Sequence, residues 1–156
     1  MIEIVNLNKT NRKQAHAIGK AAIHQHWSMF SFLLANRMDG FIIRVAMTDG
    51  VVAGYAAMVN LSSGWRIGSI AVDEAHRNKG IGARLIEDLA DIARSRGAGY
   101  LLLEVRESSS AARHLYAKMG FVVEKIVPKY YKTSAKVRRE SGLRREDAVV
   151  MRLGLR

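Results

Sequence analysis

Apolar side chains recur at two different spacings along the chain, and each spacing predicts a different kind of element. Residues 1–7 alternate apolar and polar side chains, as a half-buried strand does, and three further strands are predicted at residues 41–48, 51–60 and 65–72. Asp49-Gly50 separates the middle two strands, and this dipeptide accepts the positive φ angles of a tight hairpin turn. The first half of the chain therefore predicts an antiparallel meander.

Helical spacing appears before and after this meander. Four helices are predicted, at residues 15–24, 28–36, 81–96 and 111–119. The longest has Leu85, Leu89 and Ile92 along one stripe, and Gly97 stands where this helix is expected to stop.

The remaining strands are predicted at residues 100–105, 121–131 and 147–153. Together the elements predict an α/β fold in which a mixed, mostly antiparallel sheet of about seven strands is flanked by about four helices. No internal repeat, low-complexity stretch or linker interrupts the pattern, so we expect residues 1–156 to form a single domain.

The composition excludes several kinds of chemistry. Of the 156 residues 49% are hydrophobic and none is cysteine, which excludes a disulfide scaffold, a thiolate metal cluster and a cysteine nucleophile. The five histidines lack metal-ligand spacing, so we expect no metal. No run approaches the roughly 20 apolar residues of a membrane-spanning helix. We therefore expect a soluble, cytoplasmic protein that does not engage a membrane.

The formal net charge of +11 favours anionic partners. Seven basic residues and one acidic residue lie between Lys129 and Arg145. Two interpretations of the long connection from Lys132 to Arg145 stay open. It is either a solvated hairpin loop or a surface that contacts ribosomal RNA or an acidic substrate N-terminus.

A glycine-rich turn precedes the longest predicted helix. It reads Arg77-Asn78-Lys79-Gly80-Ile81-Gly82, and no acidic residue occupies the first helical turn. The free amides and the dipole of a helix N-terminus attract an anion, so we expect a ligand to supply the counter-ion. Leu85 does not fit a dinucleotide fingerprint, and no Walker loop is present. The alternative is a turn whose glycines serve only its own geometry.

Arg77-x-x-Gly80-x-Gly82 after Ser69-Ile70-Ala71-Val72 resembles the acetyl-coenzyme A (acetyl-CoA) signature of the GCN5-related N-acetyltransferases (GNAT). Five later pieces resemble the protein N-terminal acetyltransferases within that superfamily, which include the ribosomal-protein alanine acetyltransferases and the catalytic subunit of N-terminal acetyltransferase A. These pieces are Leu103-Glu104-Val105-Arg106, Leu115-Tyr116, Met119-Gly120-Phe121, Lys129-Tyr130-Tyr131 and Glu146-Asp147-Ala148. The resemblance implies the GNAT fold, acetyl-CoA as acyl donor and no metal.

The resemblance also implies a binding site for the donor. The strand residues would pair with the pantetheine arm, the turn would hold the pyrophosphate, and a backbone N–H near Val72 would stabilise the oxyanion. Ser109 stands where the family often has an asparagine that contacts coenzyme A, so one hydrogen bond is kept and the amide's others are lost. The implied residues are Ile70, Ala71, Val72, Arg77, Asn78, Lys79, Gly80, Ile81, Gly82, Ala83 and Ser109.

Glu104 is the candidate general base. It lies inside the apolar run of residues 101–105, an unusual place for a carboxylate without a task. The resemblance adds that the matching position of the ribosomal-protein enzymes carries the base. The alternative is a carboxylate satisfied by Arg106 or by the backbone at the end of the strand.

Tyr116 is the candidate general acid, because a phenol on this helix can protonate the departing thiolate. The match at Leu115-Tyr116 supports this role. The alternative is a core tyrosine whose hydroxyl is satisfied by a backbone carbonyl.

Protein N-termini are the favoured acceptors. An α-amino group has a pKa near 8, against about 10.4 for a lysine side chain, so a weak base suffices for it. Tyr130 and Tyr131 resemble the paired tyrosines that position the peptide in this family, and Trp27 resembles the aromatic of the opposite loop. All three can instead be packing residues.

Two other functions stay open on the sequence alone. One is acetylation of lysine side chains or small-molecule amines, and the other is a basic ribosome-binding or RNA-binding module without catalysis. The ribosome and an auxiliary subunit are further candidate partners.

Overall fold

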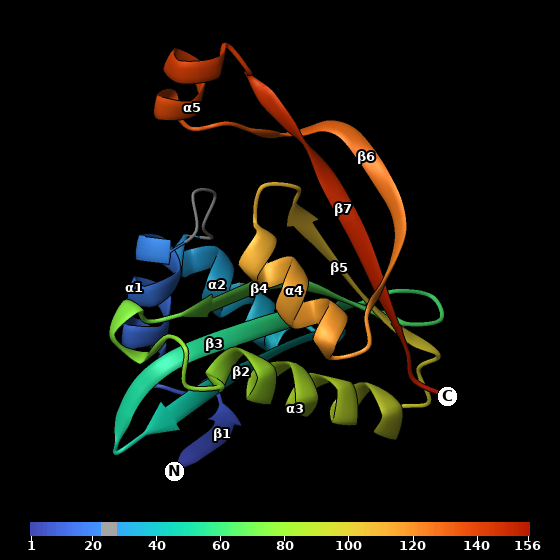
Figure 1. Cartoon of the computed structure of the whole chain (residues 1–156). Helices are drawn as coiled ribbons and strands as arrows, with labels where there is room; N and C mark the ends of the chain where they lie inside the picture. Colours follow the sequence, from blue (N-terminus) through green and yellow to red (C-terminus); the bar gives the residue numbers. More distant parts are fainter. Residues whose placement is uncertain (23–27) are drawn as a thin grey trace.

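A computed structural model describes residues 1–22 and 28–156 and shows a twisted sheet with helices on both faces (Figure 1). The strand order is β1-β2-β3-β4-β5-β7-β6. Neighbouring described strands are antiparallel, except that β4 and β5 are parallel. The elements are β1 (Ile2–Asn6), α1 (Arg12–Ala22), α2 (Met29–Arg37), β2 (Phe41–Thr48), β3 (Val51–Asn60), β4 (Trp65–Val72), η1 (Glu74–His76), α3 (Ile81–Ser95), β5 (Tyr100–Arg106), α4 (Ser110–Lys118), β6 (Val122–Lys132), α5 (Ala135–Ser141) and β7 (Arg145–Gly154).

The parallel pair at the centre of the sheet is short. Residues 65–67 of β4 lie opposite residues 101–103 of β5, and the pairing ends there. On the other side of β4, the register with β3 shifts so that Gly68 is left over between Ile67 and Ser69. A bulge bends the strand that carries it, so β4 leaves β5 beyond Ile67 and a gap opens between the two strands.

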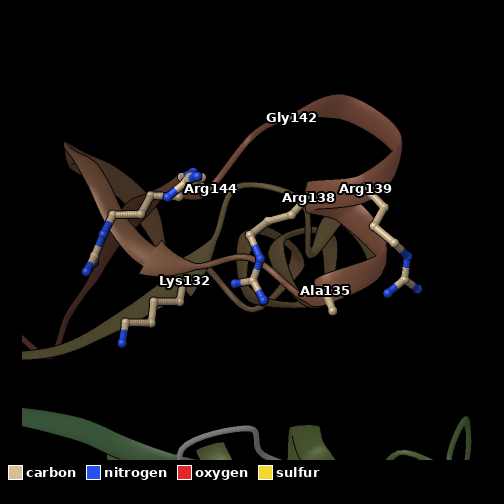
Figure 2. A pocket seen from close by; sticks show the side chains of 7 residues that line it. Lys132, Ala135, Arg138, Arg139, Gly142 and Arg144 are labelled. Carbon is tan, nitrogen blue, oxygen red and sulfur yellow. The ribbon is translucent and has the colours of Figure 1, made fainter.

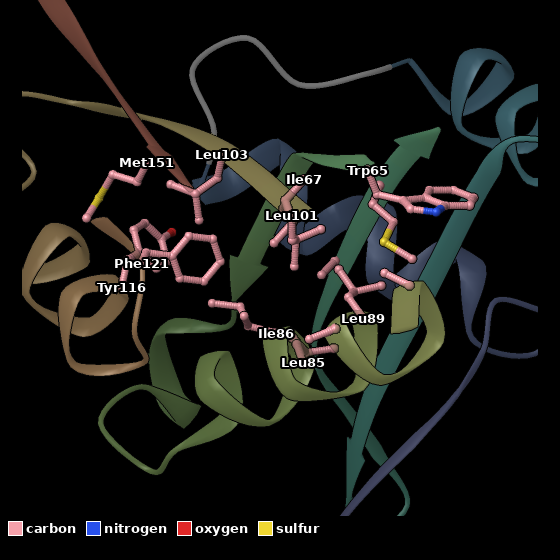
Figure 3. Close-up of a cluster of buried hydrophobic side chains, with 14 of the residues drawn as sticks. Trp65, Ile67, Leu85, Ile86, Leu89, Leu101, Leu103, Tyr116, Phe121 and Met151 are labelled. Carbon is pink, nitrogen blue, oxygen red and sulfur yellow. The ribbon is translucent and has the colours of Figure 1, made fainter. Parts of the chain in front are cut away.

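Two hydrophobic clusters cover the two faces of the sheet. On the face covered by α3 and α4, here called the α3 face, Leu85, Ile86 and Leu89 of α3 are fully buried (Figure 3). Their spacing matches the 3.6-residue period of a helix with one face on a core. On the opposite face, here called the α1 face, Phe32 of α2 packs edge-on against Tyr55 of β3, with 5.2 Å between ring centroids.

The structure confirms the predicted fold class of an α/β protein with a seven-stranded, mostly antiparallel sheet. The predicted hairpin turn is also present, because Asp49 and Gly50 have φ angles of 50° and 77°. No helix among the described residues is long and apolar enough to span a membrane.

One helix was not predicted. The connection expected as a loop contains α5, so the described residues form five α-helices instead of about four. The Ser134 hydroxyl caps this helix by accepting a hydrogen bond from the Val137 N–H at 3.3 Å. Gly142 ends it in the left-handed conformation, with φ of 72°.

Candidate active site

A cleft of about 600 Å³ lies where β4 and β5 diverge. Gly68 and Ile70 of β4 line one side of it, and the end of the β6–β7 hairpin lines another. Four residues singled out in the sequence also line this cleft, namely Glu104, Tyr116, Tyr130 and Tyr131. The fold therefore brings together side chains from three elements that are separate in the sequence.

Glu104 and Tyr116 reach the cleft from opposite faces of the sheet. Leu103 belongs to the cluster on the α3 face, and successive strand side chains alternate, so Glu104 points to the α1 face. Tyr116 comes from α4 and belongs to the α3-face cluster (Figure 3). A group bound in the gap therefore has a carboxylate on one side and a phenol on the other.

The Glu104 carboxylate is one-quarter exposed and lies near one cation. Its Oε1 is 3.4 Å from Nη1 of Arg66 on β4. Arg106, the partner considered from the sequence, instead donates to Glu146 at 2.9 Å and to the Lys132 carbonyl at 2.9 Å. Glu104 is thus held loosely by an exposed guanidinium and retains acceptor capacity toward the cleft.

The Tyr116 side chain is 8% exposed and packs against Phe121, with 6.0 Å between ring centroids. Burial raises the pKa of this phenol above its ordinary value of 10. In the described part of the chain no group forms a hydrogen bond with its hydroxyl. This differs from the alternative in which a backbone carbonyl satisfies the hydroxyl. At neutral pH the phenol carries its proton, and none of the described residues competes for it as an acceptor.

Tyr130 and Tyr131 stand at the end of β6 as an edge-to-face pair, with 4.9 Å between ring centroids. The register with β7 is interrupted between Val127 and Tyr131, where Lys129 has a φ angle of 52° and donates its N–H to Asp147 Oδ1 at 3.0 Å. This irregular turn places both rings in the lining of the cleft.

The surroundings of Tyr130 and Tyr131 raise the pKa of both phenols. Glu104, as a hydrogen-bond acceptor and as a negative charge, raises the pKa of Tyr130. Burial and the charge of Glu104 raise the pKa of Tyr131 to about 12, although the Arg106 guanidinium lies 4.5 Å above its ring. Both phenols are therefore neutral donors beside a carboxylate at neutral pH. Trp27, the third aromatic expected to contact the acceptor, lies outside the described residues.

The glycine-rich turn has the backbone geometry of an open helix N-terminus. Asn78 and Gly80 have φ angles of 61° and 81°, Gly80 is the N-cap of α3, and no side chain caps the helix. A Cβ at Gly82 would approach the Leu115 side chain no closer than 3.6 Å, so packing alone would accept alanine there. The Arg77 and Lys79 side chains donate to the carbonyls of Val72 and Ala75 at 3.3 and 3.4 Å, within the same turn.

The β4 residues predicted to hold the donor lie where one edge of the strand is free. Residues 69–72 of β4 pair with β3 on one side, and on the β5 side the pairing has already ended. Their backbone amides on that side are therefore available to a ligand with amide groups of its own. The cleft lining includes Ile70 but neither Ala71, Val72 nor the turn, so the turn forms a separate part of the same end of the sheet.

Ser109 precedes α4, and its hydroxyl makes no capping hydrogen bond. Its N–H donates to the Arg106 carbonyl at 3.0 Å, which fixes the start of α4 at the end of β5. It does not line the cleft. Among the described residues no three acidic, histidine or cysteine side chains gather as a metal site.

Sequence reasoning missed Arg66 as a residue of the site. Arg66 lies opposite Leu102 in the parallel pair, and Glu104 is two positions further along the same face of β5. This proximity depends on the register between β4 and β5, because Arg66 and Glu104 are 38 positions apart in the sequence. The one sequence signal is an arginine between two core residues, Trp65 and Ile67.

Comparisons with known proteins identify the family of the chain. Residues 3–121 match the acetyltransferase (GNAT) family. The ribosomal protein bS18-alanine N-acetyltransferase of Escherichia coli is 32% identical over 153 residues, which cover 98% of this chain and 97% of that protein. The crystal structure of the Escherichia coli ribosomal-protein-S18-alanine N-acetyltransferase superposes with a TM-score of 0.85 at 30% identity, covering 99% of this chain and 94% of the other.

Two further relatives widen the comparison. The streptothricin acetyltransferase of Streptomyces lavendulae is 47% identical over 77 residues, which are 47% of this chain and 40% of that protein. The structure of yncA from Salmonella typhimurium with its cofactor acetyl-CoA shares the fold, with a TM-score of 0.82 at 22% identity over 100% of this chain and 95% of the other. The chain belongs to the acetyltransferase (GNAT) family and is an N-acetyltransferase.

Proposed function

We propose that this protein transfers the acetyl group of acetyl-CoA to the α-amino group of a protein N-terminus. The observation that carries the proposal is the placement of Glu104 and Tyr116 on opposite sides of one gap in the sheet. Amine acetylation by a thioester needs a proton acceptor beside the amine and a proton donor beside the sulfur. A single pocket that offers both from opposite faces lets two substrates enter from different sides.

The donor would bind on the α3 face. The free edge of β4 suits the amides of a pantetheine arm, and the uncapped start of α3 suits a diphosphate. Bound there, acetyl-CoA supplies the activated acyl group. The residues that would hold it are Ile70, Ala71, Val72, Arg77, Asn78, Lys79, Gly80, Ile81, Gly82, Ala83 and Ser109.

Glu104 and Tyr116 move the two protons of the reaction. Glu104 accepts the proton that the amine loses, directly or through a water, as the amine nitrogen bonds to the acetyl carbon. Tyr116 donates its proton to the sulfur as the carbon–sulfur bond breaks, and its raised pKa keeps that proton in place before the reaction. A backbone N–H of β4 near Val72 would stabilise the oxyanion in between.

The acceptor would enter from the α1 face, where Glu104 lies beside Tyr130 and Tyr131. The two rings form a wall that can hold the first residues of an extended peptide. An α-amino group has a pKa near 8 and is deprotonated by a carboxylate more easily than a lysine ammonium. The bS18-alanine N-acetyltransferase of Escherichia coli, which matches nearly the whole chain, acts on such an amine.

The proposal is tested by acetylating matched peptides and locating the product by mass spectrometry. One peptide has a free N-terminus and its lysines blocked, and the other has a blocked N-terminus and free lysines. We expect acetylation of the first peptide only. Transfer to lysine alone would overturn the proposal.

Small-molecule amines are the second candidate acceptors, because a streptothricin acetyltransferase shares 47% identity with nearly half of the chain. Streptothricin is therefore included as a competing acceptor at equal concentration. A larger kcat/KM for streptothricin than for the free-N-terminus peptide would favour this second function.

A further inference from the structure

The β6–β7 hairpin ends in a basic arm, defined here as residues 132–145, which contains α5. The arm lies at the far end of β6 and β7, beyond the tip of β5 (Figure 1). It encloses a hollow of about 730 Å³, in which no acidic side chain takes part. Five cationic side chains line this hollow (Figure 2), namely Lys132, Arg138, Arg139, Arg144 and Arg145.

None of these five cations forms an ion pair within the described part of the chain. Two of them donate only to backbone carbonyls, Arg138 to Thr133 at 3.1 Å and Arg145 to Tyr130 at 3.3 Å. Elsewhere the chain does pair its arginines, as in the two contacts of Arg44 with Asp88 at 2.7 and 3.1 Å. The hollow therefore gathers positive charge that the protein itself leaves uncompensated.

Internal hydrogen bonds order the backbone of the arm, and two of its five cations, Arg138 and Arg145, are also hydrogen-bonded to backbone carbonyls. Thr133 is 5% exposed, although it is polar, and its hydroxyl donates to the Leu143 carbonyl at 2.6 Å. Its N–H donates to the Arg144 carbonyl at 3.1 Å. Together with the Ser134 cap and the Gly142 stop, these bonds close the base of the arm. Guanidinium groups on such a backbone are well suited to bind carboxylates.

The hollow adjoins the cleft and shares two lining residues with it. Lys132 and Arg145 lie opposite each other in the β6–β7 ladder, and both line the hollow and the cleft. Val150 of β7 lies opposite Glu104, and Arg145 lies five positions before Val150, at the start of β7. At about 3.4 Å per residue this is roughly 17 Å, so an extended peptide with its amine at Glu104 reaches Arg145 after about five residues.

We infer that the basic arm selects acceptor proteins with acidic residues at about positions 5 to 8 from the N-terminus. The inference rests on the proposed function, because it takes the acceptor's amine to lie at Glu104. A peptide fits better than RNA because the hollow adjoins the cleft in which the amine is proposed to lie. The nearest aromatic rings, Tyr130 and Tyr131, meet edge to face, and Arg106 covers the Tyr131 ring, so the pair does not form a parallel platform for successive bases.

The test compares two peptides with identical first four residues, one with glutamates and one with glutamines at positions 5 to 8. We expect kcat/KM to be about tenfold higher for the glutamate peptide at low salt, as two or three exposed ion pairs would give. In the triple variant Arg138→Gln, Arg139→Gln, Arg144→Gln the ratio should fall to about one. The matched control Arg94→Gln, Arg96→Gln, Arg156→Gln removes the same charge away from the arm and should keep the ratio.

Salt provides a second readout that needs no variant. The ratio in the wild-type protein should fall toward one as NaCl rises from about 20 to 300 mM, because exposed charge pairs are screened. A wild-type ratio of one at low salt, with both peptides acetylated, overturns the inference and leaves the proposed function standing. Acetylation of neither peptide refutes the proposed function instead. A ratio of one together with RNA binding that the triple variant loses would assign the arm to RNA.

Discussion

Two arginines that line the cleft, Arg66 and Arg106, face carboxylates, whereas the cations that line the hollow of the basic arm do not. Arg66 faces Glu104 at 3.4 Å and Arg106 faces Glu146 at 2.9 Å. In the arm no carboxylate pairs with the lining cations in the described structure. The difference separates two tasks. Compensated charge at the cleft keeps a carboxylate in place for the proton transfer proposed above, whereas uncompensated charge in the arm is available to the acidic partner proposed above.

The largest effect is expected for Glu104→Gln. Glutamine keeps the shape of the side chain and cannot accept the amine proton, so kcat/KM should fall about 100-fold or more at pH 7. The loss should shrink above about pH 8, where the α-amino group is already deprotonated. Acetylation rates from pH 6 to 10 measure this.

The matched control for that variant is Glu124→Gln. Glu124 also faces an arginine, Arg152 at 3.3 Å, but on the outer strand β6. The activity of the Glu124→Gln variant should equal that of the wild type at every pH. A pH-independent defect in Glu104→Gln would show that the carboxylate only positions Arg66 or Tyr130.

A smaller loss, of about 10- to 100-fold in kcat, is expected for Tyr116→Phe. Phenylalanine keeps the ring against Phe121, so the melting temperature should hardly change. Because burial raises the pKa of Tyr116 above its ordinary value of 10, the wild-type phenol stays protonated near neutral pH, and the defect should be the same from pH 7 to 9. Steady-state kinetics check both points. Tyr100→Phe, outside the cleft, is the control, and equal rates in both variants would contradict the assignment of Tyr116 as acid.

Much of the fold was predictable because its signals are local. The helix predicted at residues 81–96 is found as α3 (Ile81–Ser95), and Gly97 follows with a φ angle of 76°. α5 was missed for a physical reason. It buries none of its residues, so its apolar positions carry no helical period, and only Ser134 and Gly142 marked its ends.

The candidate site was predictable where a residue conflicts with its surroundings. Glu104 was recognisable as a carboxylate within an apolar strand, and the structure puts it in the cleft with Tyr116. Arg66 and the link between Arg106 and Glu146 were not, because they depend on pairings between distant strands. The shared lining of cleft and hollow by Lys132 and Arg145 is likewise a property of the β6–β7 register.

Glu146→Gln removes the charge that pairs with Arg106 and should lower the free energy of unfolding by about 1–3 kcal/mol. Glu146 is 12% exposed. Burial alone would raise its pKa, but hydrogen bonds from Arg106 and Ser108 outweigh this and lower the pKa below 4.5. A lowered pKa stabilises the fold above the unfolded value, and the stabilisation is lost as the pH falls through the folded value.

Urea unfolding at pH 7 and at about pH 3 measures this prediction. The wild type should be more stable than Glu146→Gln at pH 7, and the difference should shrink as the pH falls toward 3. Glu124→Gln, whose partner is more exposed, should change stability by less than about 1 kcal/mol. A difference of the same size at pH 7 and pH 3 would mean that packing, not the charge of Glu146, provides the stabilisation.

Arg144→Gln in the arm is expected to have the smallest effect. Unlike Glu146→Gln, it should not lower the free energy of unfolding. Arg144 is exposed, forms no ion pair within the described chain and shares the hollow with four other cations. Its removal should leave the free energy of unfolding unchanged or raise it by up to about 0.5 kcal/mol, because like charges repel, and about 0.5 M salt should abolish the gain. The matched control is Arg152→Gln, which loses a partner and should be slightly destabilised. If Arg144→Gln instead lowered the unfolding free energy by more than about 1 kcal/mol in urea titrations, the arm would be using this charge internally, and it would not be free to bind an acidic peptide.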